Sequence, residues 1–418
     1  MAAERRRVVV TGMGAATPLG VGVEALWTRC IQGESGIAPI ESFDASEFRC
    51  TVGGEVRDFV PTDFIDRKAA RRMARFSQLA LASTSEAFED AGLDLEGSDR
   101  ERVGVILGNG NGGFPNLEEM AGVLFERGGM RIEPFFLPRI LPNMAAANVA
   151  MRYGLLGYNT TVVTACAAGN HAIGEATEVI RRGAADVMVA GGTEAGFSRL
   201  GLAGFSVMRA LTSQSDDPER ASRPFDAARD GFVPAEGAAA LILESEEHAL
   251  QRGATIRAEI AGFGCSGDAY HLVMPDESGA GPVRAMRWAM EDAGVQPAEI
   301  DWVSAHGTST PLNDAGETRA LKLALGDAAA TVAVSSLKSM IGHSFGAAGA
   351  IETVVAVRTI ESGVVHPTIN QETPDPECDL DYVPNEAREM NVDVVLNNAF
   401  GFGGQNACLI VRKYESGS

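Results

Sequence analysis

An internal repeat restricts the fold of this 418-residue chain more than any other feature of its sequence. AFEDAGLD at 87–94 returns as AMEDAGVQ at 289–296, and AAG at 167–169 returns at 347–349. These strings are short and common, so chance is the alternative explanation. Two echoes in the same order favour duplication of a structural unit.

Each copy predicts the same alternation of helices and strands. The two EDAG strings end acidic helices at Gly92 and Gly294, where a left-handed cap suits glycine. A β-rich run follows each of them, VGVILGNGNGG from 103 and IDWVSAHGTST from 300. The segments after both AAG strings are apolar on most faces and predict buried helices. We therefore expect a duplicated α/β unit with these two helices between two sheets.

The boundary between the two halves is expected near residues 250–258. There EHALQRGATIRAEIAGFG passes from a charged helix into a new strand, and no low-complexity linker interrupts the chain. We predict halves 1–255 and 256–418, packed as one body.

One cysteine lies at a predicted turn from strand to helix. In TVVTACAAGNHAIGEA, residues 161–176, the β-branched run up to Thr164 predicts a strand, and apolar residues from Ile173 onward follow helical spacing. Cys166 therefore lies at a helix N-terminus, where the helix dipole favours a thiolate. The alternative is a buried cysteine that acts as a small apolar side chain.

Three further residues occupy the same kind of position. VSAHGTSTPLND places His306 directly after an apolar strand, and VSSLKSMIGHSFGAAGA places Lys338 after another strand and His343 before a small-residue helix. The carboxyl ends of strands are where α/β proteins collect catalytic groups. Each histidine alone is more often structural, but the set indicates a catalytic cysteine with two histidines.

Composition and spacing disfavour several other functions. The net charge of −21 argues against a nucleic-acid partner. The six cysteines include no CxxC, which fits free thiols in a reducing compartment, and the Cys and His residues lack short metal-ligand spacing. GNGNGG at 108–113 lacks the spacing of a dinucleotide fingerprint. No apolar run reaches about 18 residues, so we expect a cytoplasmic protein without a membrane span, metal or cofactor of its own.

Several long motifs together resemble one family. TACAAG, AHGTSTPLND, LKSMIGHSFGAAGA and NNAFGFGGQN are similar to motifs of the β-ketoacyl-[acyl carrier protein] synthases, most of all the type II elongating ketosynthases of fatty acid synthesis. The resemblance runs from VVVTGMGAATPLG to CLIVRKY, nearly the whole chain. It implies the duplicated five-layer α-β-α-β-α fold of the thiolase superfamily, which agrees with the repeat.

The resemblance also implies catalytic roles. Cys166 would carry the acyl chain as a thioester, and His306 and His343 would serve decarboxylation of malonyl-[acyl carrier protein] and stabilise the resulting oxyanion. Lys338 would support the histidines. The product would be β-ketoacyl-[acyl carrier protein] and CO2, and the only prosthetic arm would be the phosphopantetheine of the carrier protein.

Further positions take their roles from the same resemblance. Phe402 would act as the gate of the acyl pocket and, with the backbone of Cys166, form an oxyanion hole; Glu352 would lie behind Lys338. The implied pantetheine contacts are Thr308 and Thr310. In the acyl pocket Asn111 stands where an aliphatic side chain is common, and Gln405 stands where Thr or His is common. Either departure could mark a specialised primer, or neutral drift.

Basic residues predict where the carrier protein docks. DRKAARRMARF predicts one short helix with Arg67, Lys68, Arg71, Arg72 and Arg75. The docking set implied by the resemblance is Lys68, Arg71, Arg72, Arg131 and Arg209. A solvated basic helix without a partner is the alternative.

The family is homodimeric, and PFFLP at 134–138 resembles the segment whose Phe136 reaches the acyl pocket of the neighbouring subunit. Other functions remain on the same fold: a ketosynthase of a polyketide or aryl polyene pathway, a noncatalytic chain-length partner subunit, or a thiolase. A noncatalytic subunit typically lacks the nucleophile, which this chain keeps. A thiolase uses a second cysteine, and Cys408 lies in a strand-like segment instead.

Overall fold

The computed structural model describes residues 5–417 and contains two five-stranded units of the same design. The strands of the first unit follow the spatial order β6-β5-β7-β8-β1, with bounds β1 Val8–Thr17, β5 Val103–Gly108, β6 Asn159–Val162, β7 Val187–Glu194 and β8 Gly237–Ser245. The second unit follows the order β11-β10-β14-β15-β9, with bounds β9 Ala258–Gly267, β10 Trp302–Ser304, β11 Ala333–Ser335, β14 Val394–Gly401 and β15 Gln405–Arg412. If the five strands of each unit are numbered by their order in the sequence, both units have the same spatial order, 3-2-4-5-1.

The strand directions repeat as well. In each unit the second strand runs parallel to both of its neighbours, and the last two pairings are antiparallel. The two sheets meet at their first strands, where Val9 pairs with Glu259 and Val10 with Ala258. The predicted duplication of an α/β unit is confirmed.

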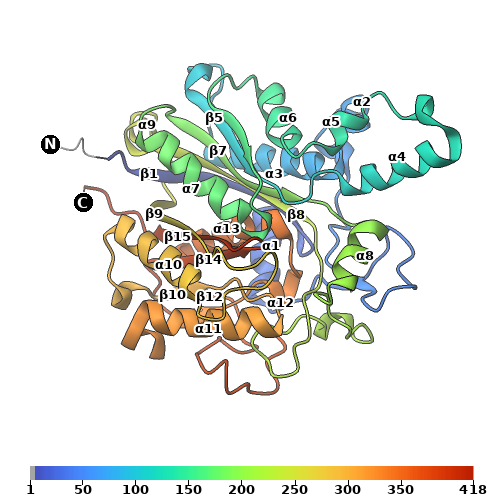
Figure 1. The fold of residues 1–418 in the computed structure, drawn as a ribbon. Helices are drawn as coiled ribbons and strands as arrows, with labels where there is room; N and C mark the ends of the chain where they lie inside the picture. Colours follow the sequence, from blue (N-terminus) through green and yellow to red (C-terminus); the bar gives the residue numbers. More distant parts are fainter. Residues whose placement is uncertain (1–4, 418) are drawn as a thin grey trace.

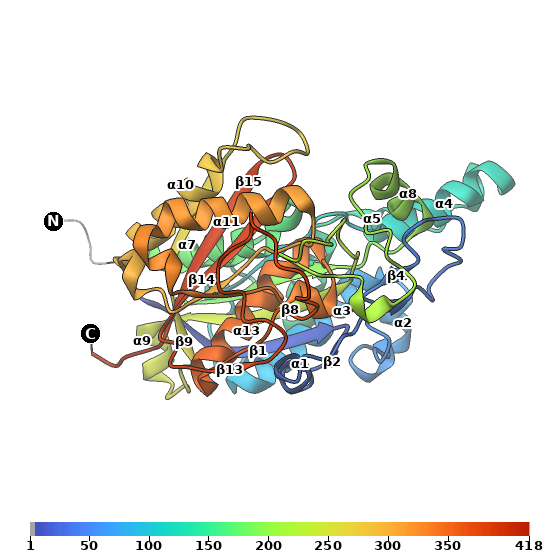
Figure 2. The same ribbon diagram turned by 90° about the horizontal axis from the view of Figure 1, so that it is seen from below.

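Helices complete five layers (Figures 1 and 2). Between the sheets lie α7 (Ala168–Arg181) and α13 (Ala348–Ser362), which pack on each other and on strands of both sheets. The outer layers contain α3 (Arg75–Ala91) and α6 (Met144–Tyr153) on the first sheet, and α10 (Ala280–Ala293) and α11 (Pro311–Leu325) on the second. The helices after the AAG strings are therefore the buried ones, because apolar faces on all sides find partners only between two sheets.

The echoed glycines end matched helices. Gly92 after α3 and Gly294 after α10 both have positive φ, 56° and 68°, as left-handed caps. Each buried helix begins with a tight turn, Ala165–Ala167 before α7 and Phe345–Ala347 before α13. The first residue of each turn also has positive φ, 48° at Ala165 and 44° at Phe345, so the repeat extends to backbone conformation.

The remaining elements lie in the connections. The helices among them are α1 (Val23–Ile31), α2 (Arg67–Ala70), α4 (Phe114–Arg127), α5 (Phe136–Ile140), α8 (Arg199–Val207), α9 (Glu246–Gln251) and α12 (Lys338–Ile341). The short strands are β2 (Gly20–Val21), β3 (Ala38–Pro39), β4 (Val52–Gly53), β12 (Val364–Val365) and β13 (Arg388–Glu389). Figure 1 shows α4 projecting beyond the first sheet on the side of α5 and α8. Within residues 5–417, no helix combines the length and apolarity needed to cross a bilayer.

Candidate active site

The turn before α7 carries a buried thiol. Cys166 follows the positive-φ residue Ala165 and is only 6% exposed. Burial is the largest influence on its pKa and raises it to about 12, and the charge of Glu194 adds to the rise, whereas Lys338 and the backbone N–H groups of Phe402 and Cys166 itself act in the opposite direction. The predicted preference for a thiolate is therefore wrong for the free protein, because loss of hydration outweighs the favourable dipoles.

One cavity of about 530 Å³ joins most of the predicted site residues. Its walls come from both halves of the chain. The predicted residues that line it are Cys166, His306, His343, Phe402, Thr308, Thr310, Asn111 and Arg209. Lys338 and Glu352 lie behind the wall, and Phe136, at the start of α5, does not line the cavity of its own chain.

The two histidine rings contact each other edge to face in the cavity wall. Their ring centroids are 5.4 Å apart with planes at 87°. Burial is the main cause that holds the pKa of both imidazoles well below the ordinary 6.5, and the charge of Lys338 adds to it. Both rings are therefore neutral near pH 7, and the Nδ1 atoms of His306 and His343 are buried with no hydrogen-bond partner among residues 5–417.

Lys338 forms a fully buried ion pair. Its Nζ atom in α12 donates to Oε1 of Glu352 in α13, and both side chains are 1% exposed. A buried cation needs such a partner to remain charged. The pair places a positive charge near both histidines and the thiol; this charge adds to the lowering of both histidine pKa values and opposes the rise in the pKa of Cys166.

Two buried carboxylates hold the loop that carries His306, and the sequence did not assign them a role. Glu317 accepts the backbone N–H groups of His306 and Gly307, both at 2.8 Å. Asp314, one turn earlier on α11, accepts the N–H of Ser309 at 3.1 Å. Both lie within the stretch that begins with the motif AHGTSTPLND, but the sequence shows only two acidic residues on a helix. Thr308 and Thr310 at the end of this loop share a hydrogen bond of 2.9 Å.

Phe402 lies in the hairpin between β14 and β15. Gly403 and Gly404 after it have φ of 84° and 69°, which only glycine adopts easily, and Gly403 donates its N–H to the carbonyl of Leu272 at 2.8 Å. Phe402 is half-buried and lines the cavity. Gln405 is exposed and lies outside the cavity lining.

The basic segment near residue 70 is shorter than predicted. Helix α2 ends at Ala70, and Arg75 belongs to α3, where its guanidinium binds the carboxylate of Glu236 at 2.7 Å. The prediction of one basic helix that includes Arg75 is wrong, because this arginine is drawn inward by a buried partner. Of the predicted docking residues, Lys68, Arg71, Arg72, Arg131 and Arg209 are all exposed.

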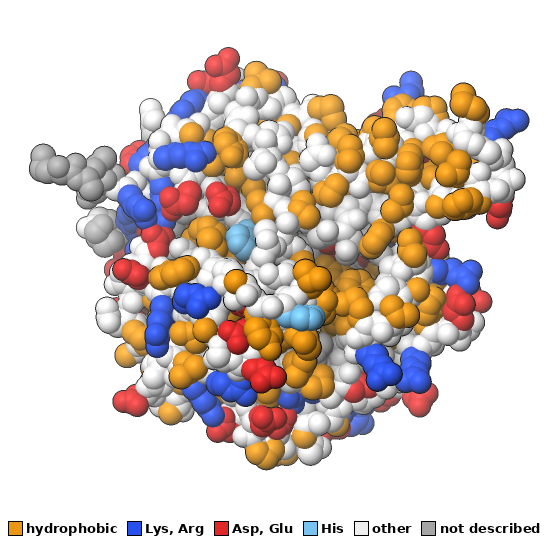
Figure 3. Space-filling model, viewed as in Figure 1, with side chains coloured by type: hydrophobic (Ala, Val, Ile, Leu, Met, Phe, Trp, Pro, Cys, Tyr) orange, Lys and Arg blue, Asp and Glu red, His pale blue; other side chains and the backbone are white. Residues whose placement is uncertain are grey.

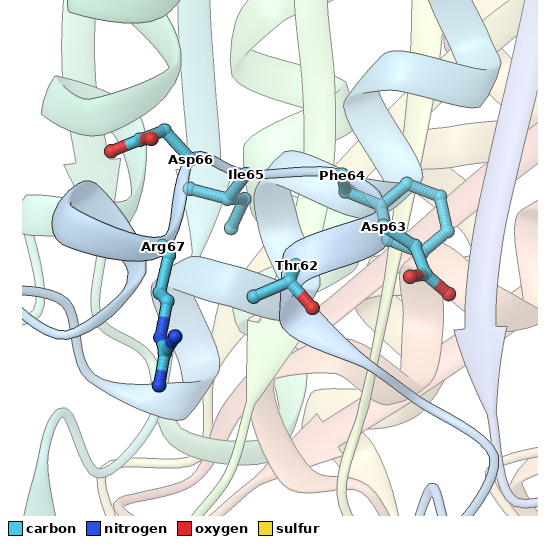
Figure 4. Close-up of a pocket in the computed structure, with 6 residues that line it drawn as sticks. All are labelled: Thr62, Asp63, Phe64, Ile65, Asp66 and Arg67. Atoms are coloured by element: carbon cyan, nitrogen blue, oxygen red, sulfur yellow. The ribbon is translucent and has the colours of Figure 1, made fainter.

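A broad, open hollow of about 780 Å³ borders the start of α2 (Figure 4). It is formed by residues 62–67. Asp66 caps α2 by accepting the N–H groups of Lys68 and Ala69 at 2.9 and 3.2 Å. In Figure 4 the side chains of Arg67 and Thr62 extend to one side of the segment and that of Asp66 to the other. The hollow contains none of the predicted catalytic residues.

Two family models match the chain in succession. The model described as "Beta-ketoacyl synthase, N-terminal domain" matches residues 5–249, and that described as "Beta-ketoacyl synthase, C-terminal domain" matches residues 257–372. The chain belongs to the β-ketoacyl synthase family. Among curated relatives in this family, the 3-oxoacyl-[acyl-carrier-protein] synthase 2 of Coxiella burnetii is 49% identical over 98% of the chain and 99% of the relative. That of Synechocystis sp. is 48% identical over 99% of each.

Solved structures of β-ketoacyl synthases share the fold. A β-ketoacyl synthase from Burkholderia phymatum is 36% identical, with a TM-score of 0.90 over 98% of this chain and all of that one. The ishigamide ketosynthase/chain length factor is 38% identical, with a TM-score of 0.93 over 99% of this chain and all of that one. The predicted thiolase-like α/β fold is confirmed.

Proposed function

We propose that the protein is a 3-oxoacyl-[acyl-carrier-protein] synthase that condenses a Cys166-bound acyl group with malonyl-[acyl carrier protein] in fatty acid elongation. The observation that carries the proposal is the convergence of Cys166, His306 and His343 on one cavity. The names of the relatives, nearly half identical over almost the whole chain, support the same activity. We infer a division of labour between halves 1–255 and 256–418, with the nucleophile in the first and the histidine pair in the second.

In the first step the acyl group moves to the enzyme. The thiol of Cys166 loses its proton as its sulfur attacks the carbonyl carbon of the acyl thioester. The tetrahedral oxyanion accepts hydrogen bonds from the backbone N–H groups of Cys166 and Phe402. In the free protein these two N–H groups interact with the sulfur. The bond to the carrier's sulfur then breaks, and that sulfur leaves with the proton that the Cys166 thiol gave up. A thiol pKa of about 12 keeps the proton in place until the substrate arrives.

In the second step a carbon–carbon bond forms. Malonyl thioester loses CO2, and the electron pair of the broken bond passes into an enolate. N–H groups of the neutral His306 and His343 donate to the enolate oxygen, which is why their low pKa values suit the reaction. The enolate carbon attacks the acyl-Cys166 carbonyl, the carbon–sulfur bond breaks, and the thiolate of Cys166 takes up a proton.

The test separates the two steps. Cys166→Ala is expected to abolish condensation, because no acyl-enzyme can form, while leaving the thermal unfolding curve close to that of the parent. Cys166→Gln, whose carboxamide resembles an acylated thiol, is expected to raise the release of CO2 from malonyl-carrier without condensation. Full condensing activity of Cys166→Ala would sink the assignment of the nucleophile.

The same Cys166→Gln protein tests the histidines. Because burial lowers the pKa of both imidazoles below 6.5, neither changes its charge as pH falls through 6.5. We expect the rate of CO2 release to show no inflection near pH 6.5. Burial raises the pKa of Glu317, which holds the His306 loop, to about 7, so a sigmoidal change centred there contradicts the assignment only if it persists when Glu317→Gln is added.

We infer that acyl carrier protein docks on the exposed basic residues near the cavity. Arg209 supports this inference most directly, since it is exposed and also lines the cavity. Lys68, Arg71, Arg72 and Arg131 extend the set. The exposed cations suit an acidic partner even though the whole chain has a net charge of −21.

We infer that two chains form a homodimer through the first sheet. Strand β6 is the outermost strand of that sheet and is partly exposed along its length. Large exposed apolar side chains flank it, including Leu137, Leu141, Met151, Leu156 and Tyr158. Figure 3 shows apolar side chains gathered over the region of α4, α5 and α6. A contiguous apolar face of this kind typically marks an interface, and Phe136 on α5 would then contribute to the partner's acyl pocket.

A further inference from the structure

A single buried carboxylate joins the two halves beside Cys166. Glu194 is the last residue of β7 and has no exposed surface. Its Oε2 atom accepts the N–H of Gly110 at 2.8 Å and that of Gly346 at 3.2 Å, and its Oε1 atom accepts the N–H of Asn111 at 3.2 Å. Gly110 and Asn111 follow β5 in the first unit, whereas Gly346 belongs to the turn before α13 in the second.

The segments held by Glu194 are two walls of the cavity. Gly110 and Asn111 line it. Phe345, next to Gly346, also lines it and stacks on Phe205 with ring centroids 5.1 Å apart. The side chain of Glu194 itself does not line the cavity. Its hydrogen bonds are therefore with the backbone of the two wall segments and hold these segments together.

Close packing leaves little freedom at this junction. A Cβ atom added to Gly110 would lie 2.7 Å from Oε2 of Glu194, and one added to Gly346 would lie 2.6 Å from the N atom of Gly110. The two backbones are therefore in direct contact where the carboxylate binds both. Three N–H donors on one carboxylate stabilise its ionised form, while burial raises the pKa of Glu194 to about 7.

We propose that Glu194 is a positioning residue that holds the loop at Gly110–Asn111 against the turn at Phe345–Gly346, and thereby fixes the part of the cavity wall that decides which acyl chains reach Cys166. The proposal rests on the proposed condensing activity. Glu317 differs from Glu194 because it accepts the N–H groups of the loop that carries His306. Its effect is therefore on the histidines that serve decarboxylation of the malonyl thioester. In both units, the loop after the second strand (β5 in the first unit, β10 in the second) lines the cavity and donates backbone N–H groups to a buried carboxylate.

The amide Glu194→Gln has the same shape but different hydrogen bonds. It offers one acceptor oxygen, and its NH2 group would face at least one backbone N–H donor. A buried N–H without an acceptor is costly, so one wall moves away from the other. Glu194→Asp keeps the charge but is one methylene shorter, so it cannot reach both walls.

The experiment measures acyl transfer to Cys166 from butyryl- and palmitoyl-carrier and, separately, release of CO2 from malonyl-carrier. For Glu194→Gln we expect the ratio of palmitoyl to butyryl transfer to change by about tenfold, as expected for one lost buried hydrogen bond, with release of CO2 close to that of the parent. Glu194→Asp should shift the ratio in the same way, and serves alone if Glu194→Gln does not fold.

Glu244→Gln is the matched control. Glu244 is also a fully buried strand carboxylate, but it pairs with Val187 at the other end of β7 and binds Thr11 and Arg252. It should lower stability without changing the palmitoyl-to-butyryl ratio. Equal losses of both acyl transfers and of CO2 release in the Glu194 variants, or no change at all, would overturn the proposal. Absence of acyl transfer in the parent protein would instead overturn the proposed function.

Discussion

The outer edges of the two sheets differ although the sheets share one design. Strand β6 ends the first sheet with partly exposed residues, and no further strand pairs with its outer side within residues 5–417. Strand β11 ends the second sheet fully buried, because Val334 donates its N–H to the carbonyl of Asp381 at 2.8 Å. One copy of the unit has covered its edge with its own chain, and the other has left it free to pair.

The turns before the two central helices differ in the same way. Both begin with a positive-φ residue, but the second position is Cys166 in one turn and Gly346 in the other. The first turn presents a thiol to the cavity. The second brings its backbone against Gly110, where a side chain has no room. The duplicated fold thus contains two equivalent turns. One carries the nucleophile that we propose, and the other makes a close backbone contact.

Gly346→Ala should give the largest effect, since it adds a side chain to the turn whose backbone packs against Gly110. The new Cβ would lie 2.6 Å from a backbone nitrogen that no side-chain rotation can move. We expect a loss of about 1–3 kcal/mol in unfolding free energy, as for overpacked cores, measured by urea denaturation. Condensation should fall with it, because the loop at Gly110 must shift. Gly204→Ala in α8, where an added Cβ meets open space, should lose nothing. Equal stability of the two variants would contradict the close contact.

Two charges beside the bare edge should test the dimer. Met151 and Leu156 are 68% and 69% exposed in the single chain. Met151→Asp with Leu156→Asp is expected to convert dimers into monomers in sedimentation experiments at micromolar concentration, because charges in an apolar interface lose hydration. Leu323→Asp, on the outer helix of the covered half, should leave the oligomeric state unchanged. A doubly substituted protein that sediments like the parent would exclude this face as the interface.

Charge reversal at Arg71 and Arg72 should have the smallest effect. Exposed ion pairs contribute about 0.2–1 kcal/mol each, so we expect the KM for acyl-carrier to rise several-fold and kcat to change less. The difference should shrink with added salt. Arg72 also lies over the ring of Phe135 at 4.8 Å, so part of its loss would be local packing.

Arg287→Glu, on the outer surface of the second unit, is the control for this surface. It should leave carrier use unchanged. An equal loss with carrier-free pantetheine thioesters would show that Arg71 and Arg72 do not bind the carrier.

Local signals in the sequence determined much of the architecture. Glycine caps at 92 and 294, apolar segments after each AAG and β-branched runs all act within a few residues of themselves. They predicted the repeat and the central position of α7 and α13. The same signals predicted that Cys166 and His306 follow strands. The residue types Cys and His, which the sequence shows directly, then marked them as candidate catalytic groups.

The tertiary structure alone decided how these groups behave. Burial reversed the expected thiolate character of Cys166, and Glu236 drew Arg75 away from the basic segment. Glu194 and Glu317 could not be identified from the sequence, because their partners are backbone N–H groups, which nearly every residue has. Only the tertiary structure determines which backbone N–H groups lie beside a carboxylate. These contacts hold in place the loops from both halves that line the cavity.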